Sequence, residues 1–118
     1  MDKRIRVVLS ILDRDFCRPV RPGELAAIVG VGRSRLEHLF KADTETSIRT
    51  YIRRRRLAEA ARLLSTTRLR ICEVARTVGF SDVVNFTHAF TETYGMSPRA
   101  YRTETQHFLP TSDDSYQE

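Results

Sequence analysis

The sequence predicts an all-α fold of seven helices, in which a long linker helix joins two helix-turn-helix units. Two observations predict this fold. Apolar residues recur three and four positions apart along most of the chain, which is the spacing of the buried face of a helix. Part of the chain also repeats itself with an offset of about 50 residues, so one unit is expected to occur twice.

Three short helices are predicted in the first unit. The first has an apolar face formed by Ile5, Val8, Leu9, Leu12 and Phe16. Pro22 suits the first turn of the second helix, and Gly30 suits its end. The third helix, over 35–42, has an apolar face formed by Leu36, Leu39 and Phe40. Two short helices around a turn that contains glycine are the helix-turn-helix layout.

A longer helix follows, with Ser47 as its N-cap, and extends over about 18 residues without Gly or Pro. Helical spacing restarts at Ile71, and a further helix begins at Ser81, whose hydroxyl is a candidate cap. The last helix has Ser97 as N-cap and Pro98 at its first position. The C-terminal residues turn polar and acidic, and we expect a disordered tail. The predicted divisions are a first unit at 1–46, a linker helix at 47–65, a second unit at 66–103 and the tail at 104–118.

The internal repeat spans both predicted units. The segment "GELAAIVGV" at 23–31 aligns with "CEVARTVGF" at 72–80. After an insertion of one residue, the alignment continues with the pairs Leu36 and Phe86, His38 and His88, and Phe40 and Phe90. Solenoids need three or more repeats, and a plain bundle does not need the same turn in each half. The repeat therefore favours tandem helix-turn-helix units.

The chain is basic, with a net charge of +5 and a sequence pI of about 9.8. Lysine occurs only at Lys3 and Lys41, so arginine supplies most of the positive charge. The planar guanidinium group suits phosphate and the edge of guanine, which indicates a nucleic-acid partner. A compositional bias in which arginine simply replaces lysine is an equal alternative on this evidence.

The residues that enzymes and metal sites use do not form a recognisable pattern. His38, His88 and His107 lack the spacing of metal ligands, and no Ser-His-Asp or paired-carboxylate pattern occurs. Cys17 and Cys72 form no C-x-x-C pair, so neither a disulfide framework nor a zinc site is expected. No segment has the roughly 18 apolar residues of a membrane span. We therefore expect no catalytic residue, metal, cofactor or membrane partner.

The second unit closely resembles a known family. The segment "ICEVARTVGFSDVVNFTHAFTETYGMSPRAYR" is similar to the signature of AraC/XylS-type transcription regulators, and the resemblance covers about residues 5 to 102. The chain departs from the family at Glu45, where the family usually has Gly, and at Val83 and Val84, where polar residues are common. The matching positions are Ile71, Ala75, Val78, Gly79, Phe80, Phe86, Phe90, Gly95, Ser97, Pro98, Tyr101 and Arg102.

The resemblance implies a homeodomain-like tandem that binds double-stranded promoter DNA as an activator or repressor. One helix of each unit would enter one of two adjacent major grooves. A linker of this length is roughly 27 Å long and adjacent major grooves are about 34 Å apart, so one chain would suffice for an asymmetric site. The resemblance also implies contact with RNA polymerase and a location in the bacterial cytoplasm, at the nucleoid. The alternative is a protein-interaction adaptor, or a polymerase-contacting module, with weak DNA binding of its own.

Most relatives of this kind have a separate domain that senses a small molecule and dimerises. We expect the chain to be the excised C-terminal part of such a regulator, with a missing N-terminal effector and dimerisation domain. A small stand-alone regulator is the alternative.

The first unit has five candidate base-reading residues, namely Arg33, Ser34, Arg35, Glu37 and His38. Arginine pairs with guanine O6 and N7, and glutamate accepts a hydrogen bond from cytosine N4. For Glu37, the alternative is an ion pair with a neighbouring arginine.

In the second unit, Phe86 and Phe90 are predicted to lie in the core, so three other residues face outward, namely Val84, Asn85 and His88. Asparagine pairs with adenine in a bidentate manner, and a valine methyl group packs on the methyl group of thymine. Val83 also has a spacing that suits the core, and we favour the core position for it.

Candidate phosphate contacts are Ser81, Thr87, Arg53 and Arg54. The run "RRRR" at 53–56 covers all sides of a helix, so only one or two of its members would face DNA. Arg56 is expected to be bound within the fold instead.

Overall fold

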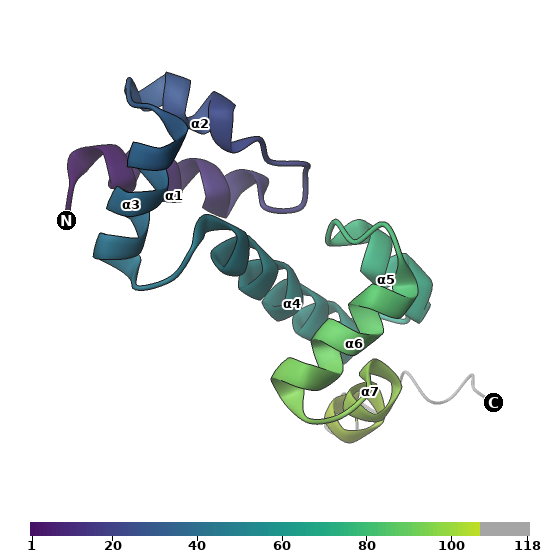
Figure 1. Ribbon diagram of the computed structural model, residues 1–118. Helices are drawn as coiled ribbons and strands as arrows, with labels where there is room; N and C mark the ends of the chain where they lie inside the picture. Colours follow the sequence, from purple (N-terminus) through teal and green to yellow (C-terminus); the bar gives the residue numbers. More distant parts are fainter. Residues whose placement is uncertain (107–118) are drawn as a thin grey trace. The chain divides into compact units, whose positions relative to one another are not determined.

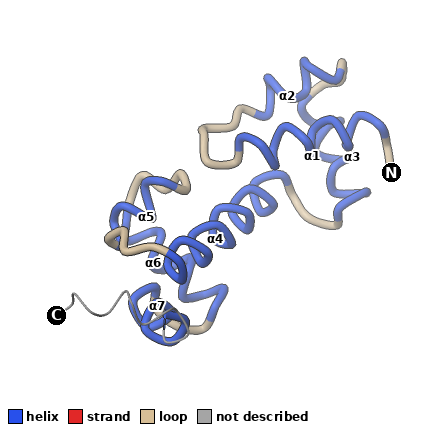
Figure 2. The backbone as a smooth tube through the Cα atoms, turned by 180° about the vertical axis from the view of Figure 1, so that it is seen from behind, coloured by secondary structure: helices blue, strands red, loops and turns tan. Residues whose placement is uncertain are grey.

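The computed structural model describes residues 1–106, and in them the chain forms helices and no strand (Figures 1 and 2). The predicted all-α fold with seven helices is therefore confirmed. The last helix continues to Gln106, and the rest of the expected tail, 107–118, lies outside the described residues. The helices are α1 (Lys3–Asp15), α2 (Pro22–Val29), α3 (Arg33–Thr44), α4 (Ile48–Thr66), α5 (Ile71–Thr77), α6 (Val83–Tyr94) and α7 (Pro98–Gln106).

The chain divides into two compact units, Met1–Arg56 and Leu57–Glu118. The division falls inside α4, so the first half of this helix closes the first unit and its second half opens the second. The four-part division expected from the sequence remains a prediction.

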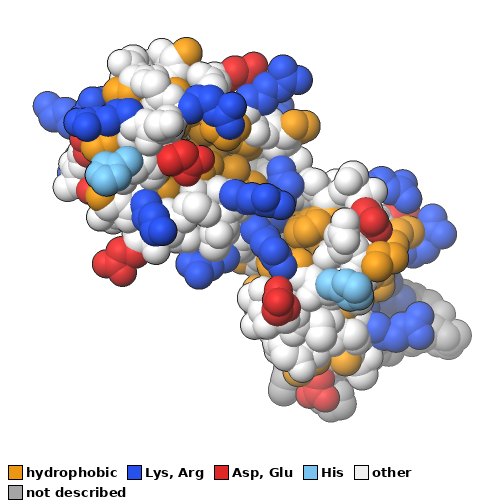
Figure 3. Space-filling view, viewed as in Figure 1, with side chains coloured by type: hydrophobic (Ala, Val, Ile, Leu, Met, Phe, Trp, Pro, Cys, Tyr) orange, Lys and Arg blue, Asp and Glu red, His pale blue; other side chains and the backbone are white. Residues whose placement is uncertain are grey.

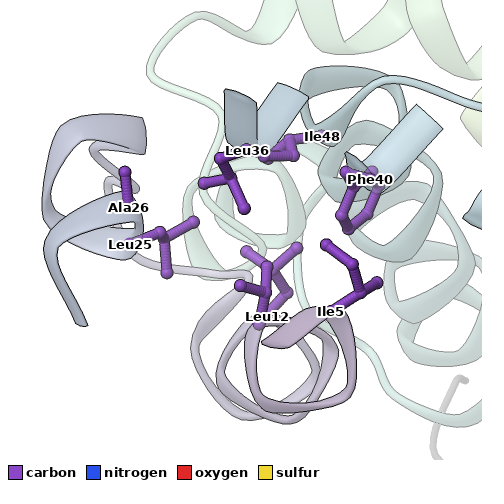
Figure 4. Packing of buried hydrophobic residues seen from close by; sticks show 8 residues of the cluster. Ile5, Leu12, Leu25, Ala26, Leu36, Phe40 and Ile48 are labelled. Atoms are coloured by element: carbon purple, nitrogen blue, oxygen red, sulfur yellow. The ribbon is translucent and has the colours of Figure 1, made fainter. Parts of the chain in front are cut away.

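The first unit has a core to which four helices contribute (Figure 4). Its largest side chain, Phe40, is fully buried, and the Tyr51 ring meets it edge-on, with ring centroids 5.7 Å apart. Burying a residue of this kind stabilises a fold by about 1.5–3 kcal/mol. The core residues are Ile5, Val8 and Leu12 of α1, Leu25 and Ala26 of α2, Leu36 and Phe40 of α3, and Ile48 of α4.

The second unit has a core built on aromatic rings. Phe86 and Phe90 are fully buried, as the sequence predicts, and their ring centroids lie 5.8 Å apart. The Phe80 ring meets Phe86 at 5.3 Å, and the Tyr101 ring meets Phe90 at 5.3 Å. Aliphatic side chains from α4, α5, the end of α5 and α6 are also buried, among them Leu57, Ala60 and Leu64 of α4, Val74 and Ala75 of α5, Val78 just after α5, and Ala89 of α6.

Side-chain caps begin several of the helices. The hydroxyl of Ser47 accepts a hydrogen bond from the Thr50 N–H at 3.1 Å, and Ser97 caps α7 in the same way. Both caps confirm predictions. The prediction of Ser81 as the cap of α6 is wrong, because the N-cap is Asp82, whose carboxylate accepts from the Val84 N–H at 2.8 Å.

The fourth helix of each unit is bound to backbone carbonyl groups at the end of the unit's first helix. In the first unit, the Arg56 guanidinium donates to the carbonyl oxygen atoms of Phe16 at 2.6 Å and Arg18 at 2.9 Å. In the second unit, the side-chain amide of Gln106 donates to the backbone carbonyl oxygen atoms of Leu64 at 2.9 Å and Thr67 at 2.7 Å. Arg56 and Gln106 are 50 residues apart, so the repeat extends to these contacts. The expectation that Arg56 is bound within the fold is confirmed.

Candidate nucleic-acid interface

A tight turn positions α3 in the first unit. Gly30 ends α2 with a φ of 77°, and the Val31 N–H donates to the Ala26 carbonyl oxygen at 3.0 Å, which closes the turn. Gly32 is the N-cap of α3, so Arg33 is its first residue. The α2–turn–α3 segment is thus a helix-turn-helix, in which three residues separate the two helices.

The buried side of α3 determines which of its residues face solvent. Leu36 and Phe40 are buried in the core. Four of the five predicted reading residues are exposed, namely Arg33, Ser34, Arg35 and His38, and Glu37 is half-buried. They therefore lie on the solvent side of one helix, as a reading face requires.

Cationic residues lie along this helix. Arg33, Arg35 and Lys41 all belong to α3, and Figure 3 shows lysine and arginine side chains, together with acidic ones, near a histidine on the first unit. Glu37 forms no ion pair within the part of the chain that the structure describes. Its carboxylate is therefore available to accept a hydrogen bond from a ligand.

The second unit repeats this geometry around α5 and α6. Gly79 has a φ of 105°, and the Phe80 N–H donates to the Ala75 carbonyl oxygen at 2.9 Å. Three predicted reading residues, Val84, Asn85 and His88, are exposed on α6. Their side of the helix is opposite to the buried side, which contains Phe86 and Phe90.

Val83 does not lie in the core, so the prediction for this residue is wrong. Its side chain is 38% exposed and lines a shallow groove of about 400 Å³ together with Cys72, Phe80 and Asp82. Side chains on a helix lean toward its N-terminus. At the first position of α6, this direction takes Val83 past the end of the core and leaves it partly exposed, although it lies on the same side of the helix as Phe86 and Phe90.

The candidate phosphate residues lie on several elements. Ser81 is exposed just before α6, and Thr87 is half-buried within it. Arg53 and Arg54 are exposed on α4. Within the same run, the Arg55 guanidinium lies 3.2 Å from the Asp13 carboxylate and 4.7 Å from the Phe16 ring centroid, so it serves the fold.

The sequence predictions give no role to Arg49 and Arg99. They are exposed at the second positions of α4 and α7, and they are equivalent in the repeat. Each therefore places an exposed cation in the first turn of the helix that follows α3 or α6 in the chain. The internal repeat, in which Arg49 and Arg99 are equivalent, is the sequence feature that points to these two residues.

Two further findings concern metal ligands and membrane-spanning helices. No group of three or more His, Cys, Asp or Glu side chains in residues 1–106 could hold a metal ion. Within the same residues, no helix has the length and apolar character needed to cross a membrane.

The chain is similar to proteins of one class. A helix-turn-helix domain family matches residues 25–104. The arabinose operon regulatory protein of Escherichia coli K12 is 38% identical over 103 residues, which are 86% of this chain and 35% of that protein. The chain spans 24–41% of the length of the curated relatives that it matches most strongly.

Solved structures agree with this class. A transcriptional regulator with an AraC-type DNA-binding domain from Chromobacterium violaceum is 28% identical, with a TM-score of 0.80, covering 91% of this chain and 94% of that one. The DNA-binding domain of AdpA, solved in complex with a target DNA, is 27% identical, with a TM-score of 0.81, covering 93% and 98%. The fold is thus that of a tandem helix-turn-helix domain. The chain belongs to the AraC-type helix-turn-helix family, which consists of DNA-binding domains of transcription regulators and not of enzymes.

Proposed function

We propose that this chain is the part of a transcription regulator that binds promoter DNA in a sequence-specific manner, with α3 and α6 in adjacent major grooves. One observation supports it above all: in each of two equivalent units, the second helix of the helix-turn-helix exposes one side and buries the other, which contains Leu36 and Phe40 in α3 and Phe86 and Phe90 in α6. A helix held in this way by a helix-turn-helix presents its side chains to base edges. The similarity to a domain solved with its target DNA adds support.

The proposed base contacts differ between the two helices. In the first unit, Arg33 and Arg35 pair with guanine, and Glu37 accepts from cytosine. Ser34 and His38 complete this face, and Val84, Asn85 and His88 form that of the second unit. Because histidine is the one residue type that the two faces share, the preferred site is asymmetric. Arg53, Arg54, Ser81 and Thr87 contact phosphate groups.

The whole protein has further proposed partners. Contact with RNA polymerase accounts for activation, in line with the family resemblance. A separate effector and dimerisation domain is supported by the share of its relatives' length that the chain spans. A regulator of this kind works on the chromosome, so we place it in the bacterial cytoplasm, at the nucleoid.

The substitution Asn85→Ala tests the reading role of α6. Asn85 is exposed, so its loss leaves the core intact. We expect binding to the preferred duplex to weaken by about 1–3 kcal/mol, and binding to an unrelated duplex to stay nearly unchanged. Thr93→Ala, another exposed change on α6, is the control and should alter neither affinity. Equal losses on both duplexes would contradict the reading role.

Salt dependence distinguishes DNA binding from the adaptor alternative. Six or so phosphate contacts give a slope of about −5 when the logarithm of the association constant is plotted against that of the salt concentration. A slope near zero would favour an adaptor.

A further inference from the structure

The first turn of α6 exposes two apolar side chains that are adjacent in the sequence. The exposed fractions are 38% for Val83 and 56% for Val84. The other large hydrophobic residues that are exposed in residues 1–106 are Met1, Val7 and Ile28, and they lie apart from one another in the sequence. Single exposed apolar residues are ordinary on a protein surface. In contrast, Val84 lies on the proposed reading face, Val83 is exposed beside it in the same turn, and Figure 3 shows hydrophobic side chains beside a histidine on the second unit.

The side chains of α6 are poorly suited to attract phosphate groups. The sequence of α6, VVNFTHAFTETY, contains neither Lys nor Arg and has one carboxylate, Glu92. By contrast, α3 has three cationic residues, Arg33, Arg35 and Lys41. Neutralisation of phosphate groups by such residues supplies the salt-dependent part of DNA affinity. Direct contacts of α6 with DNA must therefore be mainly hydrogen bonds and apolar contacts.

The chemistry of this turn matches that of A·T base pairs. Thymine is the base that presents a methyl group in the major groove, and its partner adenine offers N6 and N7 to asparagine. Valine has one strongly preferred side-chain rotamer in a helix, so its methyl groups are held in place before binding. Asn85 follows the two valines and is also exposed. The first turn of α6 thus offers contacts that suit thymine and adenine, with Val84 and Asn85 on the reading face and Val83 at the start of the helix.

We propose that Val83 and Val84 recognise the 5-methyl groups of thymine, so that the second unit selects an A·T box through methyl contacts instead of charge. This inference rests on the proposed function, since it requires α6 to enter the major groove. It adds Val83 to the reading residues and defines the class of base in one of the two boxes.

The test replaces each thymine of the preferred site in turn by uracil. This replacement removes one methyl group and leaves the hydrogen-bonding groups of the base pair in place. The affinity of the full chain for each duplex is measured by fluorescence anisotropy at near-physiological salt. We expect uracil at one or two positions of one box to weaken binding roughly 3- to 10-fold.

Two variants then identify the side chains responsible. For each thymine whose replacement weakens binding, one of the two variants, Val83→Ala or Val84→Ala, is expected to bind the thymine and uracil duplexes equally. That variant has already lost the valine methyl groups that contact the thymine methyl group. Val7→Ala is the matched control. It removes the same atoms from a valine of α1 that is 45% exposed, and it should retain the full effect of uracil.

The outcomes separate this inference from the proposed function. Specific binding that uracil leaves unchanged at every position overturns the methyl contacts and leaves sequence-specific binding standing. Uracil effects that persist in both valine variants overturn the assignment to Val83 and Val84. A chain that prefers no duplex overturns the inference and the proposed function together.

Discussion

Glu45 holds a backbone conformation that glycine adopts at the equivalent position of the second unit. The φ angle is 63° at Glu45, the end of α3, and 76° at Gly95, the end of α6. The Glu45 N–H donates to the Lys41 carbonyl oxygen at 2.8 Å, and the Gly95 N–H donates to the Thr91 carbonyl oxygen at 2.8 Å. A side chain disfavours this left-handed conformation, and glycine does not. The first unit therefore makes this turn at the conformational cost of a side chain in the left-handed region, and the second unit avoids that cost with glycine.

The substitution Glu45→Gly is expected to stabilise the fold. Relief of the left-handed strain exceeds the extra chain entropy of glycine in the unfolded state. We expect the free energy of unfolding, measured with urea, to rise by about 0.5–1 kcal/mol. The matched change Gly95→Ala should lower it by about 1 kcal/mol. A loss of stability in Glu45→Gly would contradict this account of the turn.

The two valines of α6 show where residue spacing loses its power to predict. Val83 lies three residues before Phe86, a spacing that suits the core, yet it is exposed together with Val84. Its exposure depends on where the helix begins, since Val83 is the first residue of α6 and no earlier turn of this helix covers it. Helix starts are less certain in a sequence than the periodicity that follows them. Asn85 and His88, one and two positions from buried Phe86, were predictable because the core residue fixes the side of the helix.

At the scale of the element, the start of α6 is set by Asp82. Its carboxylate accepts a hydrogen bond from the Val84 N–H at 2.8 Å. It is also a negative charge at the positive end of the helix dipole. The adjacent residues Ser81 and Asp82 are both good caps, so the sequence did not distinguish them. The cap holds the turn that contains Val83, Val84 and Asn85.

Asp82→Ala is expected to lower the free energy of unfolding by about 1 kcal/mol, because the Val84 N–H loses its partner. Ser81→Ala provides the control, and it should change stability by no more than about 0.5 kcal/mol, as for other surface changes. Thermal unfolding followed by circular dichroism measures both. If Ser81→Ala costs as much as Asp82→Ala, the cap has been assigned to the wrong residue.

Polar contacts also join helices to one another in ways that the spacing of apolar residues does not predict. The Tyr51 hydroxyl donates to the Asp13 carboxylate at 2.6 Å, which attaches α4 to α1. Burial, followed by this hydrogen bond, raises the pKa of Tyr51 to about 12. Stability from this shift is fully present below pH 10, the ordinary pKa of tyrosine, and is lost as the pH rises through 12. The sequence did not predict this contact, because it joins residues 38 positions apart.

At the scale of the whole molecule, two similar units differ in what they offer to DNA. Their backbones share the turn, the buried aromatic residues and the bond from the fourth helix to the first. Their reading helices differ in charge, since α3 has three cations and α6 has none. The repeat made the fold predictable, because the same sequence pattern predicts the same helix-turn-helix in each half of the chain. The contacts with DNA depend on individual side chains, which have diverged between the halves.

The central claim is that two different reading helices in one chain select one asymmetric site. Selection of bound duplexes from a randomised pool at near-physiological salt tests this claim most directly. We predict recovery of two unlike boxes about 10–11 base pairs apart, one of them rich in A·T pairs. A single box, two identical boxes or no enrichment would contradict the claim.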